Sequence, residues 1–174
     1  MVAETLICQV GAKDKALVGF DPARGSVRWA VGNDEIGSQS PAVFGFEKPQ
    51  IVLAAGDTKL MGADPTSGEL LFEYEHAGQQ GNTITPVSIG DRKVLLTTGD
   101  ISSKAIVLEE KTNDDGKPSV LVSEAWQERS IKNTYNIPVH CQNSVFAYST
   151  RILVCVDPAN GKALWRTRQP GDGF

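Results

Sequence analysis

A short pattern made of an apolar residue, a turn acid, a glycine and an aromatic residue recurs along the chain. It is L-x-x-x-D-x-x-x-G-x-x-x-W at residues 17–29 and 153–165, and it ends on Phe instead of Trp at residues 60–72. A further unit aligns if Glu109 is taken as the turn acid and Trp126 as the aromatic residue. The additional residues of that unit coincide with the polar stretch KTNDDGKPS (111–119), which predicts a hairpin with a lengthened tip. The period is about 43 residues, which is typical of repeat architectures.

The chemistry of the turn explains why the pattern recurs. An Asp at the first position of a turn accepts hydrogen bonds from the backbone ahead of it, and the Pro that follows presets φ. Gly fits the left-handed position that closes such a hairpin. We therefore interpret the motif as a structural hairpin whose aromatic side chain packs between neighbouring sheets. Its residues are Asp21, Gly25, Trp29, Asp64, Gly68, Phe72, Trp126, Asp157, Gly161 and Trp165.

Each unit contains strand signals and no helical periodicity. Segments such as QIVLAAG (50–56) and ELLFEYE (69–75) are short, rich in aliphatic and aromatic residues, and bounded by Gly, Asp or Pro. Further strands are predicted at residues 40–46, 85–90 and 137–142, one ahead of each of the last three units. Four antiparallel strands in a unit of this length predict an all-β fold, a β-propeller. The blades are expected at about 1–32, 40–75, 85–128 and 137–168 of a single 174-residue domain.

The repeat resembles that of the PQQ (pyrroloquinoline quinone)-like propeller family. That family includes quinoprotein alcohol dehydrogenases and the periplasmic lipoprotein propeller of the outer-membrane β-barrel assembly machinery. The resemblance covers essentially the whole chain and implies a ring of seven or eight blades. It also implies a periplasmic or otherwise extracytoplasmic parent, whose signal peptide would lie upstream of this segment. The sequence by itself leaves the localisation unknown.

The strand tally predicts an incomplete ring. Fifteen strands are expected, with three in the first unit and four in each of the others, so the chain is interpreted as about half of a propeller. A half-ring exposes apolar blade faces and an unpaired strand edge. Three interpretations of the half-ring are open: a segment cut from a longer propeller, a truncated gene product, or a chain that pairs with a copy of itself to complete the ring. The exposed surfaces lead us to expect self-association.

Composition excludes several classes of partner. The formal net charge is -4 and no basic patch stands out, so nucleic-acid binding is not expected. The longest apolar runs, such as IVLAA (51–55), are far short of the roughly 20 residues that span a bilayer, so membrane insertion is not expected either. The N-terminal MVAETLICQV lacks the features of a signal peptide.

Candidate catalytic groups are few. The resemblance implies that a PQQ enzyme would hold its cofactor with a disulfide between adjacent cysteines, a stacking Trp and a Ca²⁺ site of Glu, Asn and a catalytic Asp. Cys8, Cys141 and Cys155 are not adjacent, and we interpret them as small buried side chains in strands. His140 precedes Cys141 on a predicted strand, where neighbours point to opposite faces and cannot form a nucleophile–base pair. No catalytic residue and no metal ligand is assigned.

The connections between blades are the candidate binding surface. Residues 32–39, 76–83 and 129–136 are polar, and equivalent loops of a propeller gather on one face. This predicted rim contains Asp34, Glu35, Gln39, Gln80, Asn82, Lys132, Asn133 and Tyr135. Two functions remain open. The favoured one is a non-catalytic scaffold, without a cofactor, that binds a protein or peptide partner or another ligand. The alternative is a fragment of a PQQ- and calcium-dependent alcohol or sugar dehydrogenase.

Overall fold

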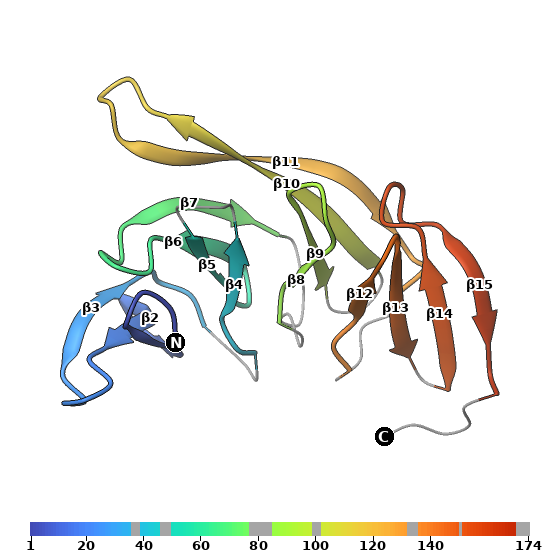
Figure 1. Ribbon diagram of the computed structural model, residues 1–174, viewed down its shortest axis with the longest axis horizontal. Helices are drawn as coiled ribbons and strands as arrows, with labels where there is room; N and C mark the ends of the chain where they lie inside the picture. Colours follow the sequence, from blue (N-terminus) through green and yellow to red (C-terminus); the bar gives the residue numbers. More distant parts are fainter. Residues whose placement is uncertain are drawn as a thin grey trace.

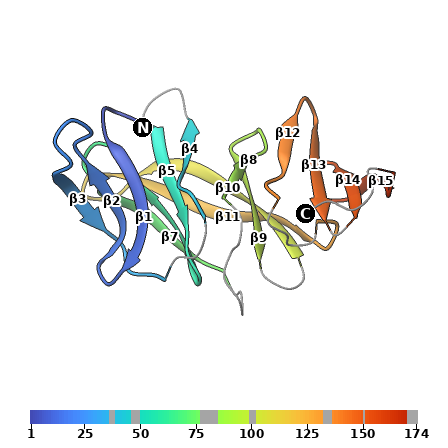
Figure 2. The same ribbon diagram turned by 90° about the horizontal axis from the view of Figure 1, so that it is seen from below.

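The computed structural model describes residues 1–35, 39–45, 50–76, 85–98, 102–131, 136–149 and 151–169. These residues form β-strands joined by turns, and the strands make four separate antiparallel sheets. The sheets follow one another in chain order along an arc (Figure 1) and stand side by side when the molecule is turned (Figure 2). The N-terminus lies beside the first sheet, at one end of this arc.

The first two sheets show the repeating unit. The first contains β1 (Leu6–Ala12), β2 (Lys15–Phe20) and β3 (Val27–Val31) in sequence order. The second contains β4 (Ala42–Gly45), β5 (Gln50–Ala55), β6 (Lys59–Ala63) and β7 (Leu70–Glu75). The recurrent motif matches β2–β3 to β6–β7, so the first sheet lacks a counterpart of β4 among the described residues. The prediction of three strands followed by sets of four is confirmed.

The last two sheets have four strands each. The third contains β8 (Val87–Ser88), β9 (Lys93–Thr98), β10 (Ser102–Thr112) and β11 (Pro118–Glu128). The fourth contains β12 (Val139–Cys141), β13 (Ser144–Ser149), β14 (Ile152–Val156) and β15 (Ala163–Thr167). The strands β4, β8 and β12 fall within the predicted segments 40–46, 85–90 and 137–142.

The lengthened hairpin of the third unit is larger than its sequence indicated. Strand β9 pairs with β10 only as far as Val107, and β10 and β11 continue together beyond it to a turn at residues 113–117. We call this projection, residues 108–122, the arm; Figure 1 shows the hairpin crossing above β7. The assignment of Glu109 as a turn acid is wrong. Glu109 pairs with Leu121 inside the arm, because the insertion extended both strands and moved the turn outward.

The hydrophobic core is divided among the junctions between sheets. One buried cluster includes Leu17 of the first sheet and Met61 of the second. A second joins Leu53 to Leu108 of the third sheet, and a third joins Ala105 to Val154 of the fourth. Each sheet is therefore stabilised mainly by burying its faces against its neighbours, with a contribution of roughly 25 cal/mol for each Å² of apolar surface removed from water.

Exposed apolar side chains concentrate on the two outermost sheets. The first sheet exposes Leu6, Val10 and Val27, and the last exposes Val139, Leu164 and Trp165. The inner sheets bury the corresponding faces in the clusters at their junctions. The described arc thus ends on two faces that have no neighbouring sheet.

The three cysteines are free, as their sequence positions suggested, but they are not uniformly buried. Cys155 is buried, Cys8 is half-buried and Cys141 is exposed. The prediction of a buried side chain is therefore wrong for Cys141. It lies at the end of β12, the edge strand of the fourth sheet, where its side chain is exposed.

Candidate interaction surfaces

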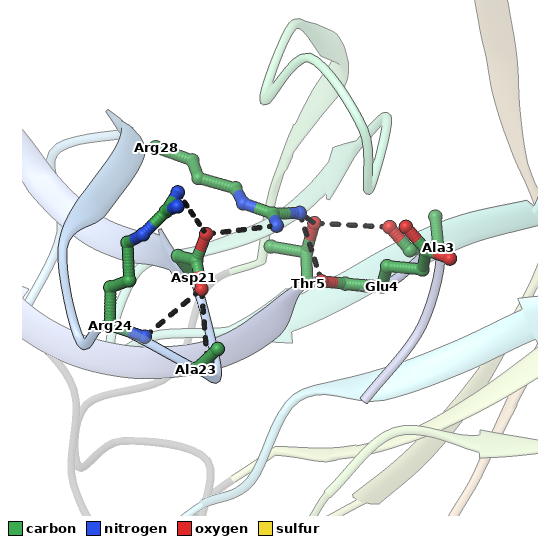
Figure 3. A network of polar contacts seen from close by, with 7 residues as sticks. All are labelled: Ala3, Glu4, Thr5, Asp21, Ala23, Arg24 and Arg28. Carbon is green, nitrogen blue, oxygen red and sulfur yellow. Dashed lines mark hydrogen bonds and ion pairs between the residues drawn. The ribbon is translucent and has the colours of Figure 1, made fainter.

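The Asp side chain at the start of the recurrent turn stabilises the turn by hydrogen bonds. Asp21 Oδ1 accepts hydrogen bonds from the backbone N–H of Ala23 at 2.9 Å and of Arg24 at 3.1 Å. Its second carboxylate oxygen lies 3.4 Å from Arg28 Nη2, and the other end of that guanidinium donates to the carbonyl oxygen of Glu4 (Figure 3). The turn is therefore tied both to its own backbone and to the N-terminal segment.

The other two copies of the turn have the same geometry. Asp64 Oδ1 accepts from the backbone N–H of Thr66 and Ser67, both at 2.8 Å, and Asp157 Oδ1 accepts from Ala159 N–H at 2.8 Å. In all three copies the closing glycine has a positive φ and donates to the carbonyl oxygen of the acid. These glycines are Gly25, Gly68 and Gly161.

The aromatic residue of one sheet seats on the turn glycine of the next sheet. A Cβ added to Gly68 would lie 2.5 Å from Trp29 Cδ2, and one added to Gly161 would overlap the ring of Trp126. Trp126 also donates from Nε1 to the carbonyl oxygen of Pro158, at 2.9 Å. The turns that receive a ring have buried glycines, and no Cβ could be accommodated there.

A small residue and a β-bulge accompany each aromatic residue on its own sheet. The cross-strand partners are Gly19 for Trp29, Gly62 for Phe72, Ala105 for Trp126 and Cys155 for Trp165. The register shifts immediately beyond that partner in all four sheets. A bulge re-aims the side chains around it, so the aromatic ring is directed by the backbone of its own strand pair.

Two positions depart from this arrangement. Phe72 joins the buried cluster shared by the second and third sheets, where the arm replaces the Asp-Pro turn. Trp165 has the same place in the motif as Trp29, yet its side chain is 45% exposed because the described chain has no sheet beyond the fourth.

Asp34, on the predicted rim, is occupied in holding the chain. Its Oδ2 accepts from the backbone N–H of Thr58 at 3.0 Å and of Lys59 at 2.8 Å, and its Oδ1 accepts from the Thr58 hydroxyl at 3.0 Å. The connection that leaves the first sheet is therefore anchored to the β5–β6 turn of the second. The carboxylate of Asp34 is therefore engaged in hydrogen bonds within the protein, independently of any partner.

Of the remaining rim residues, two are described by the structure and five are not. Glu35 is exposed, and its carbonyl oxygen accepts from Asp57 N–H at 2.8 Å, so it is presented from a fixed backbone. Gln39 is buried, and its amide oxygen and nitrogen have no hydrogen-bond partner among the residues that the structure describes. Five predicted rim residues lie outside the described ranges: Gln80, Asn82, Lys132, Asn133 and Tyr135.

His76 lies beside this anchor, directly after β7, and is only 3% exposed. Its backbone N–H donates to the carbonyl oxygen of Thr58. Burial lowers the pKa of its imidazole, against smaller opposing effects from the backbone of Lys59 and the charge of Asp34. His76 therefore favours the neutral form in the folded protein.

The arm covers a groove that the sequence did not predict. A cavity of about 410 Å³ lies between the second sheet and the arm. Ile51 and Leu71 come from the second sheet, whereas Glu110, Lys111 and Val120 come from the arm. An apolar floor with a few charged side chains at its wall is the usual character of a ligand or peptide site. The insertion in the third unit was the available signal, but its length does not say that the hairpin folds over the preceding sheet.

The groups considered for chemistry are dispersed. His140 and Cys141 are consecutive on β12, and the Asn-Asp-Asp-Gly stretch at 113–116 forms the exposed turn of the arm. Within the described ranges, no group of three or more His, Cys, Asp or Glu side chains is placed to hold a metal ion. In that same part of the chain, no helix has the length and apolar character needed to cross a bilayer.

Comparison with known proteins agrees with this geometry. A family model described as outer membrane protein assembly factor BamB matches residues 1–167. The chain belongs to this family. No curated protein gives a significant match to the sequence. The BamB-family assignment confirms the resemblance to PQQ-like propeller repeats that the sequence motif indicated.

A solved structure confirms the fold. The crystal structure of BamB from Moraxella catarrhalis superposes with a TM-score of 0.62 at 16% sequence identity. The match covers 96% of this chain and 47% of that one, so the chain spans about half the length of its solved relative. The four sheets are thus blades of a partial β-propeller, as predicted.

Proposed function

We propose that this BamB-family chain is a non-catalytic interaction module that binds a protein or peptide partner in outer membrane protein assembly. The family description supports the process and an extracytoplasmic location. The single observation that carries the binding role is the groove beneath the arm. It has an apolar floor from Ile51 and Leu71 and charged groups at its wall, a combination that suits an extended segment of another protein.

The rim of blade connections is proposed as a second contact surface. Asp34 fixes the first connection to the β5–β6 turn, which leaves the exposed carboxylate of Glu35 on a rigid support. Preorganised polar groups lose less conformational entropy when a partner binds. We assign Glu35 to partner contact and Asp34 to its positioning.

The module is proposed to work without a bound cofactor. Trp29 and Trp126 seat on turn glycines of neighbouring blades, so their rings are not available to stack on a quinone. No two of the three cysteines are adjacent in the sequence. The protein mixed with PQQ and Ca²⁺ should show no change in quinone absorbance and should reduce no dye in the presence of an alcohol. Dye reduction would contradict this part of the proposal.

Site-specific photo-cross-linking tests the partner surfaces. Benzoylphenylalanine would replace Lys111 beside the groove, Glu35 on the rim, or Ala159 on the exposed β14–β15 turn as the matched control. The probe is purified outer-membrane β-barrel assembly machinery from which its own propeller subunit has been removed. We expect a discrete cross-linked product from Lys111 and from Glu35 and none from Ala159. Products from none of the three positions, or equally from all of them, would overturn the proposal.

Self-association that completes the ring is part of the proposed function. The concentration of exposed apolar side chains on the first and fourth blades supports it. The contacts between consecutive blades within one chain suggest how two copies would join.

A further inference from the structure

The two ends of the described arc carry the two halves of one blade junction. We propose that Trp165 of one copy seats on the Gly25 turn of a second copy, and that the reciprocal contact closes a ring of two chains. This inference rests on the self-association proposed above and names its contact. The junctions between blades one and two and between blades three and four provide the template.

The template is specific in its parts. In each of these junctions an indole ring lies over a turn glycine of positive φ in the following blade. Between blades three and four the indole N–H of Trp126 also donates to the carbonyl oxygen of Pro158. Between blades one and two, Trp29 Nε1 has no hydrogen-bond partner among the described residues. An aromatic ring that both covers a backbone and donates a hydrogen bond is a common anchor of protein interfaces.

The receiving turn of the first blade is complete but empty. Gly25 has φ +68° and would have nothing within 4 Å of an added Cβ, whereas Gly68 and Gly161 are covered. Pro22 and Gly25 are exposed, whereas Pro65 and Gly68 of the matching covered turn are buried. The hydrogen bonds that Asp21 accepts from the turn already hold it in shape (Figure 3). Little ordering is needed before an indole can settle there.

The donating end is likewise prepared. Trp165 stands opposite the small, buried Cys155, as Trp126 stands opposite Ala105. Phe146 flanks it with ring centroids 6.0 Å apart. The indole is nevertheless 45% exposed, and the neighbouring Leu164 is 58% exposed. Among the described residues, Trp165 is thus held in place by its neighbours but has no partner surface, and the Gly25 turn has no aromatic ring. The two are complementary.

Two-fold symmetry satisfies both ends at once. Each copy would supply Trp165 to one new junction and Gly25 to the other, so the association closes and no aromatic residue is left over. The chain spans 47% of its solved relative, so two copies together match the length of one such chain. A second copy is therefore the occupant that fits the exposed faces at both ends.

Sedimentation velocity on the intact chain tests the ring. We expect a species of twice the 18.7 kDa monomer mass at micromolar concentration. Trp165→Ala removes one aromatic anchor from each of the two junctions, so at roughly 30-fold for each anchor the dimer should weaken by roughly 1,000-fold. Leu121→Ala is the matched control, because Leu121 is 47% exposed on the arm, away from both ends. It should leave the dimer unchanged.

A second pair of variants tests the receiving turn without removing an apolar side chain. Gly25→Asn keeps a residue that tolerates positive φ but adds bulk to the seat. Gly116→Asn makes the same change at the tip of the arm, where φ is +79° and nothing lies within 4 Å. The Gly25 variant should be monomeric and folded by circular dichroism, and the Gly116 variant should remain dimeric. Mixing the Trp165→Ala and Gly25→Asn proteins should restore a heterodimer, because one intact junction forms between them.

A monomeric wild-type chain, an open series of larger species, or equal effects of Trp165→Ala and Leu121→Ala would overturn the inference. Loss of the dimer in Gly116→Asn as well as in Gly25→Asn would do the same. These results are independent of cross-linking at Lys111 and Glu35. Failure of the ring and failure of partner binding are therefore distinguishable.

Discussion

Trp126 of the third blade donates its indole N–H to the carbonyl oxygen of Pro158 in the fourth blade, at 2.9 Å, while its ring covers Gly161 of the same turn. The Asp-Pro-x-x-Gly turn of one blade is therefore a receptor for the aromatic residue of the blade before it. Two such contacts are formed in the described chain, Trp29 on Gly68 between blades one and two and Trp126 on Gly161 between blades three and four. In each contact the aromatic ring of one blade packs on the turn glycine of the following blade.

Removing the indole N–H should weaken this junction measurably. In Trp126→Phe the half-buried carbonyl oxygen of Pro158 loses its donor, and the loss of such a hydrogen bond costs about 0.5–1.5 kcal/mol. We expect urea unfolding to show a loss of that size. Leu121→Ala, on the exposed part of the same hairpin, should stay within about 0.5 kcal/mol of the wild type. Equal losses in the two variants would show that the bond to Pro158 contributes nothing specific.

Asp34 and Glu35 are neighbours with separable roles. Asp34→Ala removes the acceptor of three hydrogen bonds from the β5–β6 turn, so the free energy of unfolding should fall by about 1–3 kcal/mol. Glu35→Ala should change it by less than about 0.5 kcal/mol. Thermal or urea unfolding of the two variants gives the comparison directly. If Asp34→Ala were as stable as the wild type, the carboxylate would be free for another task.

His76 makes stability depend on pH near neutrality. Burial lowers the pKa of its imidazole in the folded state below the ordinary value of 6.5, so below that pH the unfolded state binds the proton more readily. The free energy of unfolding should therefore be highest above pH 6.5 and should fall as the pH is lowered from there toward the folded-state pKa. An NMR titration should place the pKa of His76 below 6.5.

The chain has a second histidine that provides the control for this pH effect. His76→Asn should flatten the dependence between pH 7 and 5, whereas His140→Asn should keep most of it. A stability that is level across this range in the wild type would contradict the buried, neutral assignment of His76.

Asp21 makes the free energy of unfolding depend on pH in a more acidic range than His76 does. Its pKa is lowered from 3.8, first by the hydrogen bond from the backbone of Ala23 and further by Arg24 and Arg28, although desolvation opposes the shift. Its contribution to stability is present above pH 3.8 and is lost as the pH falls from there through the folded-state pKa. Carboxyl NMR should find the pKa of Asp21 below 3.8, and Arg28→Gln should raise it. An unchanged pKa in Arg28→Gln would contradict the contribution of the guanidinium.

The sequence predicted the turns well because their physics is local. Asp21, Pro22 and Gly25 specify a hairpin within five residues, so each copy of the motif could be recognised without its neighbours. The seat of Trp29 on Gly68 could not be found in this way, because it links two consecutive units. The signal was present in the repeat, because Trp29 and Trp126 are each followed by a unit with an Asp-Pro-x-x-Gly turn.

The features that the sequence did not show also have physical causes. Glu109 was placed at a turn because alignment cannot tell an insertion at a hairpin tip from one that extends both strands. Asp34 was grouped with exposed rim residues because its polarity is visible in the sequence, whereas its three donors on another blade are not. The groove beneath the arm depends on the direction in which β10 and β11 project, which is set by packing against β7.

A double-mutant cycle between Trp126 and Gly161 tests most directly whether the motif joins blade to blade. Gly161→Ala introduces left-handed strain of about 1–2 kcal/mol and an overlap with the ring that adds about 1–3 kcal/mol. Gly116→Ala, at the open tip of the arm, should show the strain alone. In a Trp126→Ala background the overlap disappears, so Gly161→Ala should cost at least about 1 kcal/mol less there than in the wild type. Additive losses, within about 0.5 kcal/mol, would contradict the inter-blade contact on which this account of the fold is built.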